Sequence, residues 1–68
     1  MMYITGFLCD GLSPTDEEIK ECIKTVENEN CAIILYWVAI NSQMYNIFIR
    51  KGTTFEECKE QIPKYYGM

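Results

Sequence analysis

Histidine is absent from this chain of 68 residues, and basic residues are few. Without an imidazole, the chain can form no Ser-His or Cys-His nucleophile pair and no histidine-metal site. Six Lys and Arg residues stand against ten Asp and Glu, so the net charge is −4. Affinity for nucleic acids and for anionic membranes depends on clustered basic side chains. We therefore expect neither direct nucleic-acid binding nor membrane binding.

Long hydrophobic runs, repeats and linkers are missing as well. No stretch approaches the roughly 20 apolar residues of a membrane-spanning helix, and the first residues lack the basic segment that opens a secretory signal. No Gly-, Pro- or Ser-rich segment divides the chain. We therefore predict a single domain, residues 1–68, in the cytoplasm. Its size is near the lower limit for a self-sufficient hydrophobic core.

Cysteine is abundant, but its spacing is not that of a metal site. The four residues are Cys9, Cys22, Cys31 and Cys58, with no C-x-x-C pair among them. Zinc sites usually show close ligand pairs. Free cysteine packs as a small buried hydrophobe, so we expect reduced cysteines in the core. A disulfide between one pair is the alternative, and a metal site is the least favoured interpretation.

Residues able to support catalysis are also lacking. Adjacent carboxylates occur only in residues 16–18 and 56–57, both in predicted first turns, where the helix dipole accounts for them. Gly52 stands alone, so no phosphate-cradling loop is present. Cys9 is followed by Asp10, which should raise rather than lower the pKa of its thiol. We expect no enzymatic activity, no catalytic residue, no cofactor and no metal.

The centre of the chain is the ten-residue uncharged run Cys31–Ile40, CAIILYWVAI. The run is rich in β-branched and aromatic residues and too short to cross a bilayer. This pattern favours a strand buried on both faces. The run ends at a turn signal, Asn41-Ser42-Gln43, so the next apolar segment should pair with it as a hairpin.

The remaining segments give two helices and two more strands. Residues 2–9 predict a first strand. Ser13 as N-cap and Pro14 as first residue predict a helix from Pro14 to Glu27, with an apolar stripe of Ile19, Cys22, Ile23 and Val26. Residues 44–50 predict the third strand, with Tyr45, Ile47 and Ile49 on one face. Thr54 and Glu57 form a capping box, and the helix that follows buries Phe55, Cys58 and Ile62, ends at Pro63 and leaves a tail, 64–68.

The order β-α-β-β-α predicts an α+β fold of two layers, a three-stranded sheet with two helices mainly on one face. Either the odd-numbered or the even-numbered residues of the central strand can face the helices, since both sets are apolar. The alternative places one helix on each face. With both helices on one side, the other side should be an open aromatic face, to which we assign Tyr3, Thr5, Phe7, Met44, Asn46 and Phe48.

The first helix has an acidic surface that includes Asp16, Glu17, Glu18 and Glu21, near Asp10. A solvated surface is the simplest interpretation. A docking surface would attract a basic partner and speed association. The predicted partner-binding residues are Tyr3, Phe7, Met44, Phe48, Asp16, Glu17, Glu18 and Glu21.

These features favour a non-catalytic, small acidic protein-interaction module. We expect it to dock on another protein with a basic surface, such as a nucleic-acid-binding protein, and to modulate or inhibit it; small inhibitors of phages and mobile elements offer an analogy in size and charge. One alternative is a homodimeric structural or regulatory subunit. A sheet that binds single-stranded RNA is the third candidate, weakened by the acidic charge.

Overall fold

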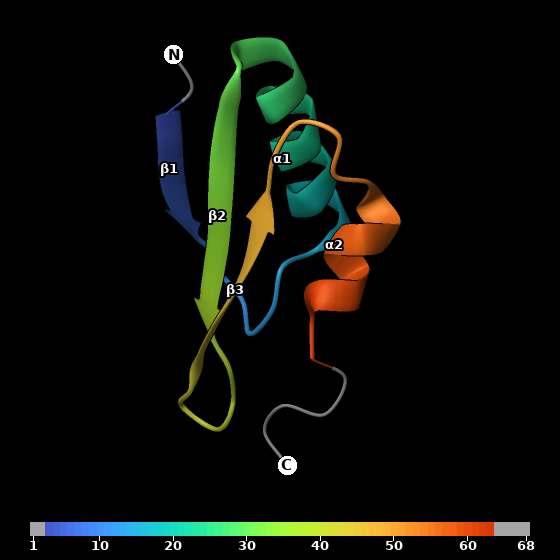
Figure 1. Ribbon diagram of the computed structural model, residues 1–68. Coiled ribbons are helices and arrows are strands. Elements are labelled where there is room, and N and C mark those ends of the chain that lie inside the picture. Colours follow the sequence, from blue (N-terminus) through green and yellow to red (C-terminus); the bar gives the residue numbers. More distant parts are fainter. Residues whose placement is uncertain (1–2, 64–68) are drawn as a thin grey trace.

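The computed structural model describes residues 3–63 and confirms the predicted order of elements (Figure 1). The predicted start of the first strand at residue 2 and the predicted tail, residues 64–68, lie outside the described residues. The elements are β1 (Tyr3–Leu8), α1 (Asp16–Glu29), β2 (Cys31–Val38), β3 (Met44–Ile49) and α2 (Phe55–Gln61). Each strand is slightly shorter than the apolar segment that predicts it.

The three strands form one mixed sheet in the order β1-β2-β3. β1 runs parallel to β2, and β3 runs antiparallel to it after the hairpin turn. Both helices lie on the same side of the sheet, as Figure 1 shows. α1 packs on β2 and β3, whereas α2 packs on β3 and α1. The fold is therefore the predicted two-layer α+β arrangement, with the helices together on one face.

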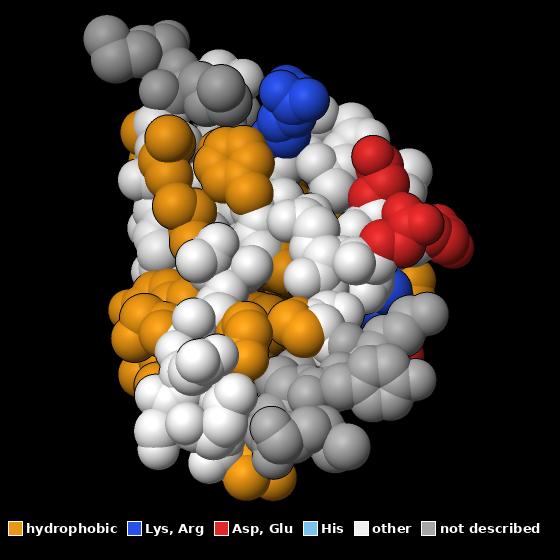
Figure 2. Space-filling model, turned by 60° about the horizontal axis from the view of Figure 1, so that its bottom comes forward, with side chains coloured by type: hydrophobic (Ala, Val, Ile, Leu, Met, Phe, Trp, Pro, Cys, Tyr) orange, Lys and Arg blue, Asp and Glu red, His pale blue; other side chains and the backbone are white. Residues whose placement is uncertain are grey.

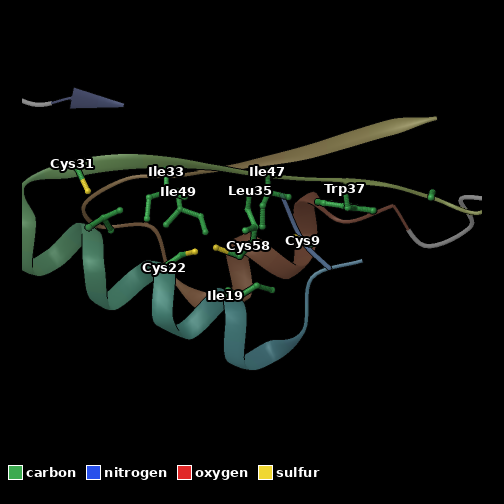
Figure 3. Close-up of a cluster of buried hydrophobic side chains, with 12 residues drawn as sticks. Cys9, Ile19, Cys22, Cys31, Ile33, Leu35, Trp37, Ile47, Ile49 and Cys58 are labelled. Atoms are coloured by element: carbon green, nitrogen blue, oxygen red, sulfur yellow. The ribbon is translucent and has the colours of Figure 1, made fainter. Parts of the chain in front are cut away.

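The odd-numbered residues of β2 face the helices and form the centre of the core. Ile33, Leu35 and Trp37 are 0–3% exposed. They pack against the apolar stripe of α1 and against Cys58 of α2, which both lie on the same side of the sheet (Figure 3). On β3, Tyr45, Ile47 and Ile49 face the same way, as predicted, and the Tyr45 ring stacks on Trp37 at 6.1 Å between centroids. From the sequence, either the odd or the even residues of β2 could face the helices; in the structure, the odd residues do.

Both helices begin directly after a threonine N-cap that forms a capping box. α1 begins at Asp16, two residues later than predicted, because Thr15 rather than Ser13 is the N-cap. The Thr15 hydroxyl accepts the Glu18 N–H at 3.1 Å, and the Glu18 carboxylate accepts the Thr15 N–H at 2.7 Å. A reciprocal capping box satisfies two helix-end donors, whereas a lone Ser satisfies one. The predicted box of Thr54 and Glu57 at α2 is confirmed, and its hydrogen bonds lower the pKa of Glu57.

The assignment of Tyr3, Thr5 and Phe7 to the open face is wrong. The parallel register pairs Tyr3 with Cys31, Thr5 with Ile33 and Phe7 with Leu35. Paired residues of adjacent strands point to the same side of the sheet. Because the odd residues of β2 face the helices, the odd residues of β1 face that side too. The even residues of β1, Ile4 and Leu8, take their place on the open face.

Candidate functional site

The first candidate surface is the side of the sheet away from both helices, which we call the open face. Met44, Asn46 and Phe48 lie there as predicted, in register with Val38, Tyr36 and Ile34 of β2. Ile4 and Leu8 of β1 are 61% and 60% exposed on the same side. The open face is made of ten strand residues: Ile4, Gly6, Leu8, Ala32, Ile34, Tyr36, Val38, Met44, Asn46 and Phe48.

The second candidate surface is a groove on the other side, between β1 and α1. It exists because α1 packs over β2 and β3 and leaves β1 uncovered. The odd residues of β1 therefore project beside the helix without being buried by it, and Phe7 is 50% exposed. We call this cavity of about 460 Å³ the acidic groove; it is lined by Phe7, Leu8, Thr15, Glu17, Glu18, Glu21, Cys22, Thr25, Ile33 and Leu35.

Apolar side chains line one side of the acidic groove and carboxylates line the other. Phe7, Ile33 and Leu35 belong to the sheet, and Glu17, Glu18 and Glu21 belong to α1. No basic side chain is among the lining residues. Lys20, on the same helix, instead lies over the Phe55 ring of α2 at 5.3 Å from its centroid. The groove therefore combines an apolar contact area with a rim of carboxylates.

The structure divides the eight predicted partner-binding residues among several places. It brings Phe7, Glu17, Glu18 and Glu21 together in the acidic groove. Met44 and Phe48 lie on the open face. Tyr3 lies toward the other end of β1, where the Cys31 thiol, burial and Glu29 raise the pKa of its hydroxyl.

Asp16 is not among the residues that line the acidic groove. It forms an ion pair with Lys59 of α2, with 2.9 Å between Oδ1 and Nζ. Sequence reasoning also missed several groove residues. Thr25 could have been found, since it lies four residues after Glu21 on the same helix face. Ile33 and Leu35 could not have been predicted as groove residues, because nothing in the sequence indicates that α1 leaves β1 uncovered.

The two outer strands of the sheet differ in how their backbone edges are protected. On β3, the Gln61 side chain bonds both backbone groups of Phe48: Oε1 accepts the N–H at 3.1 Å and Nε2 donates to the carbonyl at 3.3 Å. Directly after β1, the backbone N–H of Cys9 donates to the carbonyl of Tyr36 in β2 at 2.8 Å. Backbone groups alternate between the two edges of a strand. The N–H and C=O groups of Ile4, Gly6 and Leu8 therefore point outward, away from β2.

The edge of β1 also lacks the usual deterrents to further pairing. Natural edge strands carry charges, prolines or bulges that prevent the addition of another strand. β1 is YITGFL, with no charge and no proline. Within residues 3–63, no strand pairs with its outer side. The free edge of β1 and the acidic groove are adjacent, because Phe7 and Leu8 belong to both.

The cysteines are the nucleophilic side chains of the described region, and they lie in the core. All four cysteines are free thiols and are buried. Burial raises the pKa of Cys9 to about 11 and raises the pKa of Cys22 and Cys58 as well, so these thiols are protonated and weakly nucleophilic at neutral pH. Across residues 3–63, no three potential ligand side chains gather into a metal site.

Two further observations complete the description. Neither helix of the described region has the length and apolar character needed to cross a membrane. Comparison of the chain with protein-family models, with curated proteins and with solved structures finds no match. The acidic groove, the free edge of β1 and the open face are thus the features from which a function is inferred.

Proposed function

We propose that this protein is a non-catalytic binding module that docks an extended basic segment of another protein along β1 and thereby modulates or blocks that protein. The observation that carries the proposal is the adjacency of the free β1 edge to the acidic groove. A segment that adds to a sheet edge gains affinity from main-chain hydrogen bonds and specificity from alternate side chains. The outward N–H and C=O groups of Ile4, Gly6 and Leu8 would supply the main-chain partners.

The chemistry of the groove defines the docked segment. Alternate residues of an added strand lie on the helix side of the sheet, over Phe7 and beside α1. An apolar side chain there would contact Phe7 and Leu35, and a Lys or Arg two residues away would reach the rim of Glu17 and Glu21. The expected partner thus alternates basic and apolar residues on one face. Basic segments of this kind are frequent in nucleic-acid-binding proteins, which makes an inhibitor of such a protein the favoured form of the proposal.

A defined peptide tests the proposal directly. The probe is an eight-residue peptide, Lys-Thr-Phe-Thr-Lys-Thr-Phe-Thr, and the control peptide replaces both lysines with glutamate. NMR titration should shift the resonances of β1 and of the first half of α1 with the basic peptide only. The double variant Glu17→Lys/Glu21→Lys should weaken binding about tenfold, and added salt should weaken it further because exposed charges are screened beyond about 8 Å.

The matched control for this variant is Glu56→Lys/Glu60→Lys on α2. It changes the net charge by the same amount, and neither residue lines the groove. Glu18 is left unchanged because its carboxylate caps α1. Binding that falls equally in both double variants would show attraction to total charge alone and would overturn the proposal.

Hydrogen exchange tests the strand-addition step separately. In the free protein, the outward amides of Ile4, Gly6 and Leu8 should exchange fast, and those of Thr5 and Phe7, which face β2, should exchange slowly. Bound peptide should slow exchange at the outward amides alone. If these amides stay unprotected at saturating peptide, the partner does not pair with β1 and this mode of docking is wrong.

A further inference from the structure

The open face is a second surface whose chemistry differs from that of the acidic groove. None of its ten strand residues carries a charge. Its exposed large apolar side chains range from Phe48 at 39% to Met44 at 63%, whereas Ile34 and Tyr36 at its centre are half-buried. In Figure 2, hydrophobic side chains gather on the sheet side of the molecule and acidic side chains lie on the helix side. A chain of net charge −4 thus keeps one whole face uncharged.

The open face is filled at its centre rather than hollowed. The Tyr36 ring lies over Gly6, so that a Cβ added at Gly6 would be 3.4 Å from the ring edge. Ala32 is fully covered by its neighbours, and Ile34 and Tyr36 are only half-buried. A largely apolar surface of this kind, with Asn46 as its one amide side chain, suits another sheet, since two sheets pack face to face through interdigitating side chains.

The size of the open face matches a small homodimer interface. Three strands about 4.8 Å apart and about 20 Å long cover roughly 300 Å² in projection, so two stacked copies cover about 600 Å² together. The relief of the exposed side chains raises the accessible area above this projection, toward the lower limit of about 1,000 Å² for a specific interface. An exposed apolar patch of this size is near the largest that is usual on a monomer, and such patches are often interaction surfaces.

The distribution of charge is compatible with a second copy of the chain on the open face. Two acidic chains repel each other unless their charges are kept apart. Sheets packed face to face lie about 10 Å apart, and the acidic helices lie outside both sheets, separated by far more than the Debye length of about 8 Å. Stacking through the open faces is thus the contact between two copies that brings no carboxylate of α1 near its counterpart, whereas contact through the acidic grooves would oppose Glu17 and Glu21 to themselves.

We propose that a second copy of this chain covers the open face, giving a two-fold homodimer with the layers helix, sheet, sheet and helix. The contact is isologous, with Ile34 and Tyr36 of the central strand at its centre and Met44 and Phe48 of β3 beside them. Both acidic grooves remain on the outside of the dimer, so one dimer offers two docking sites. This inference rests on the open face alone and holds whether or not β1 docks a peptide.

Sedimentation equilibrium of the full chain tests the dimer between about 10 and about 300 µM, the range in which a contact with a micromolar dissociation constant is populated. The native chain should approach twice its monomer mass. Met44→Asp and Phe48→Asp should each shift dissociation at least tenfold toward the monomer, because stacking would bury an unpaired carboxylate. The control is Leu12→Asp, which makes the same change at a side chain that is 53% exposed outside the open face. It should dimerise like the native chain.

Other outcomes would overturn the inference. A native chain that stays monomeric at the highest concentration shows that two copies do not stack. A dimer that survives Met44→Asp and Phe48→Asp is formed elsewhere, for example by pairing of two β1 edges. Met44→Asp is the variant least expected to disturb folding, since Met44 is the most exposed of the large apolar side chains on the open face. Circular dichroism of each variant checks that the proteins compared are folded.

Discussion

At the scale of single residues, the cysteines are the clearest case of side chains used for packing. All four are free and buried, and Cys22 and Cys58 point toward each other between the helices and the sheet in Figure 3. Burial raises the pKa of Cys9, Cys22 and Cys58. We predict that a thiol reagent such as dithionitrobenzoate modifies these three slowly at pH 7.5 and rapidly in denaturant. Rapid modification of Cys22 or Cys58 in the native protein would contradict their place in the core.

The same shifts predict how stability changes at high pH. The folded pKa of Cys9, about 11, lies above its ordinary value of 9.0. The folded state therefore holds the proton more tightly than the unfolded state, so this contribution to stability is complete below pH 9 and falls as the pH rises toward 11. Urea unfolding at pH 8 and at pH 10.5 measures the difference. In Cys9→Ala, the part of the decrease that Cys9 causes should vanish.

Removing a core sulfur should cost little but measurable stability. Cys58 is fully buried where α2 meets the sheet, and Cys22 lies opposite on α1. Cys58→Ala and Cys22→Ala should each lower the free energy of unfolding by on the order of 1 kcal/mol, as other small core truncations do. Chemical denaturation measures the change. A more stable variant would show that the thiols are strained in the core.

At the scale of elements, α2 protects the edge of β3. Gln61, the last residue of α2, bonds the N–H and the carbonyl of Phe48 as a neighbouring strand would. We predict that Gln61→Ala lowers stability by about 1 kcal/mol and speeds exchange of the Phe48 amide. Gln61→Glu keeps an acceptor for that amide and loses the donor to the carbonyl, so it should preserve most of the protection. Equal exchange in all three proteins would show that this contact does not protect the edge.

The elements themselves were largely predictable from the sequence, and their relative placement was not. Periodicity identified the stripe of α1, and the Thr54 capping box located the start of α2, because both signals are local. The prediction of Ser13 as N-cap is wrong because a capping box of Thr15 with Glu18 lies two residues further on and satisfies one more donor. The face of β1 depended on a register between segments about 28 residues apart. A shift of one residue reverses every side chain of a strand, and β1 is apolar on both faces.

At the scale of the whole molecule, the acidic groove could not be predicted at all, since it results from the lateral position of α1. Asp16, Glu17, Glu18 and Glu21 are adjacent in sequence, yet Asp16 pairs with Lys59 while the other three line the groove. These four acidic residues thus divide between an exposed ion pair that links the two helices and a candidate binding surface. The open face follows from a simpler fact, that two short helices on one side of a sheet leave the other side bare.

If a second copy covers the exposed open face, the stability of the fold depends on dimer formation. A dimer that forms only from folded chains stabilises the fold by mass action, so its melting temperature rises with protein concentration. We predict a rise of several degrees for the native chain between about 5 and about 300 µM, since 1 kcal/mol shifts the melting temperature of so small a domain by roughly 4–8 °C. Phe48→Asp should melt at one temperature throughout this range, and Leu12→Asp should follow the native chain. Differential scanning calorimetry provides the measurement, and a native melting temperature that is independent of concentration would mean that the open face contributes nothing to stability in solution.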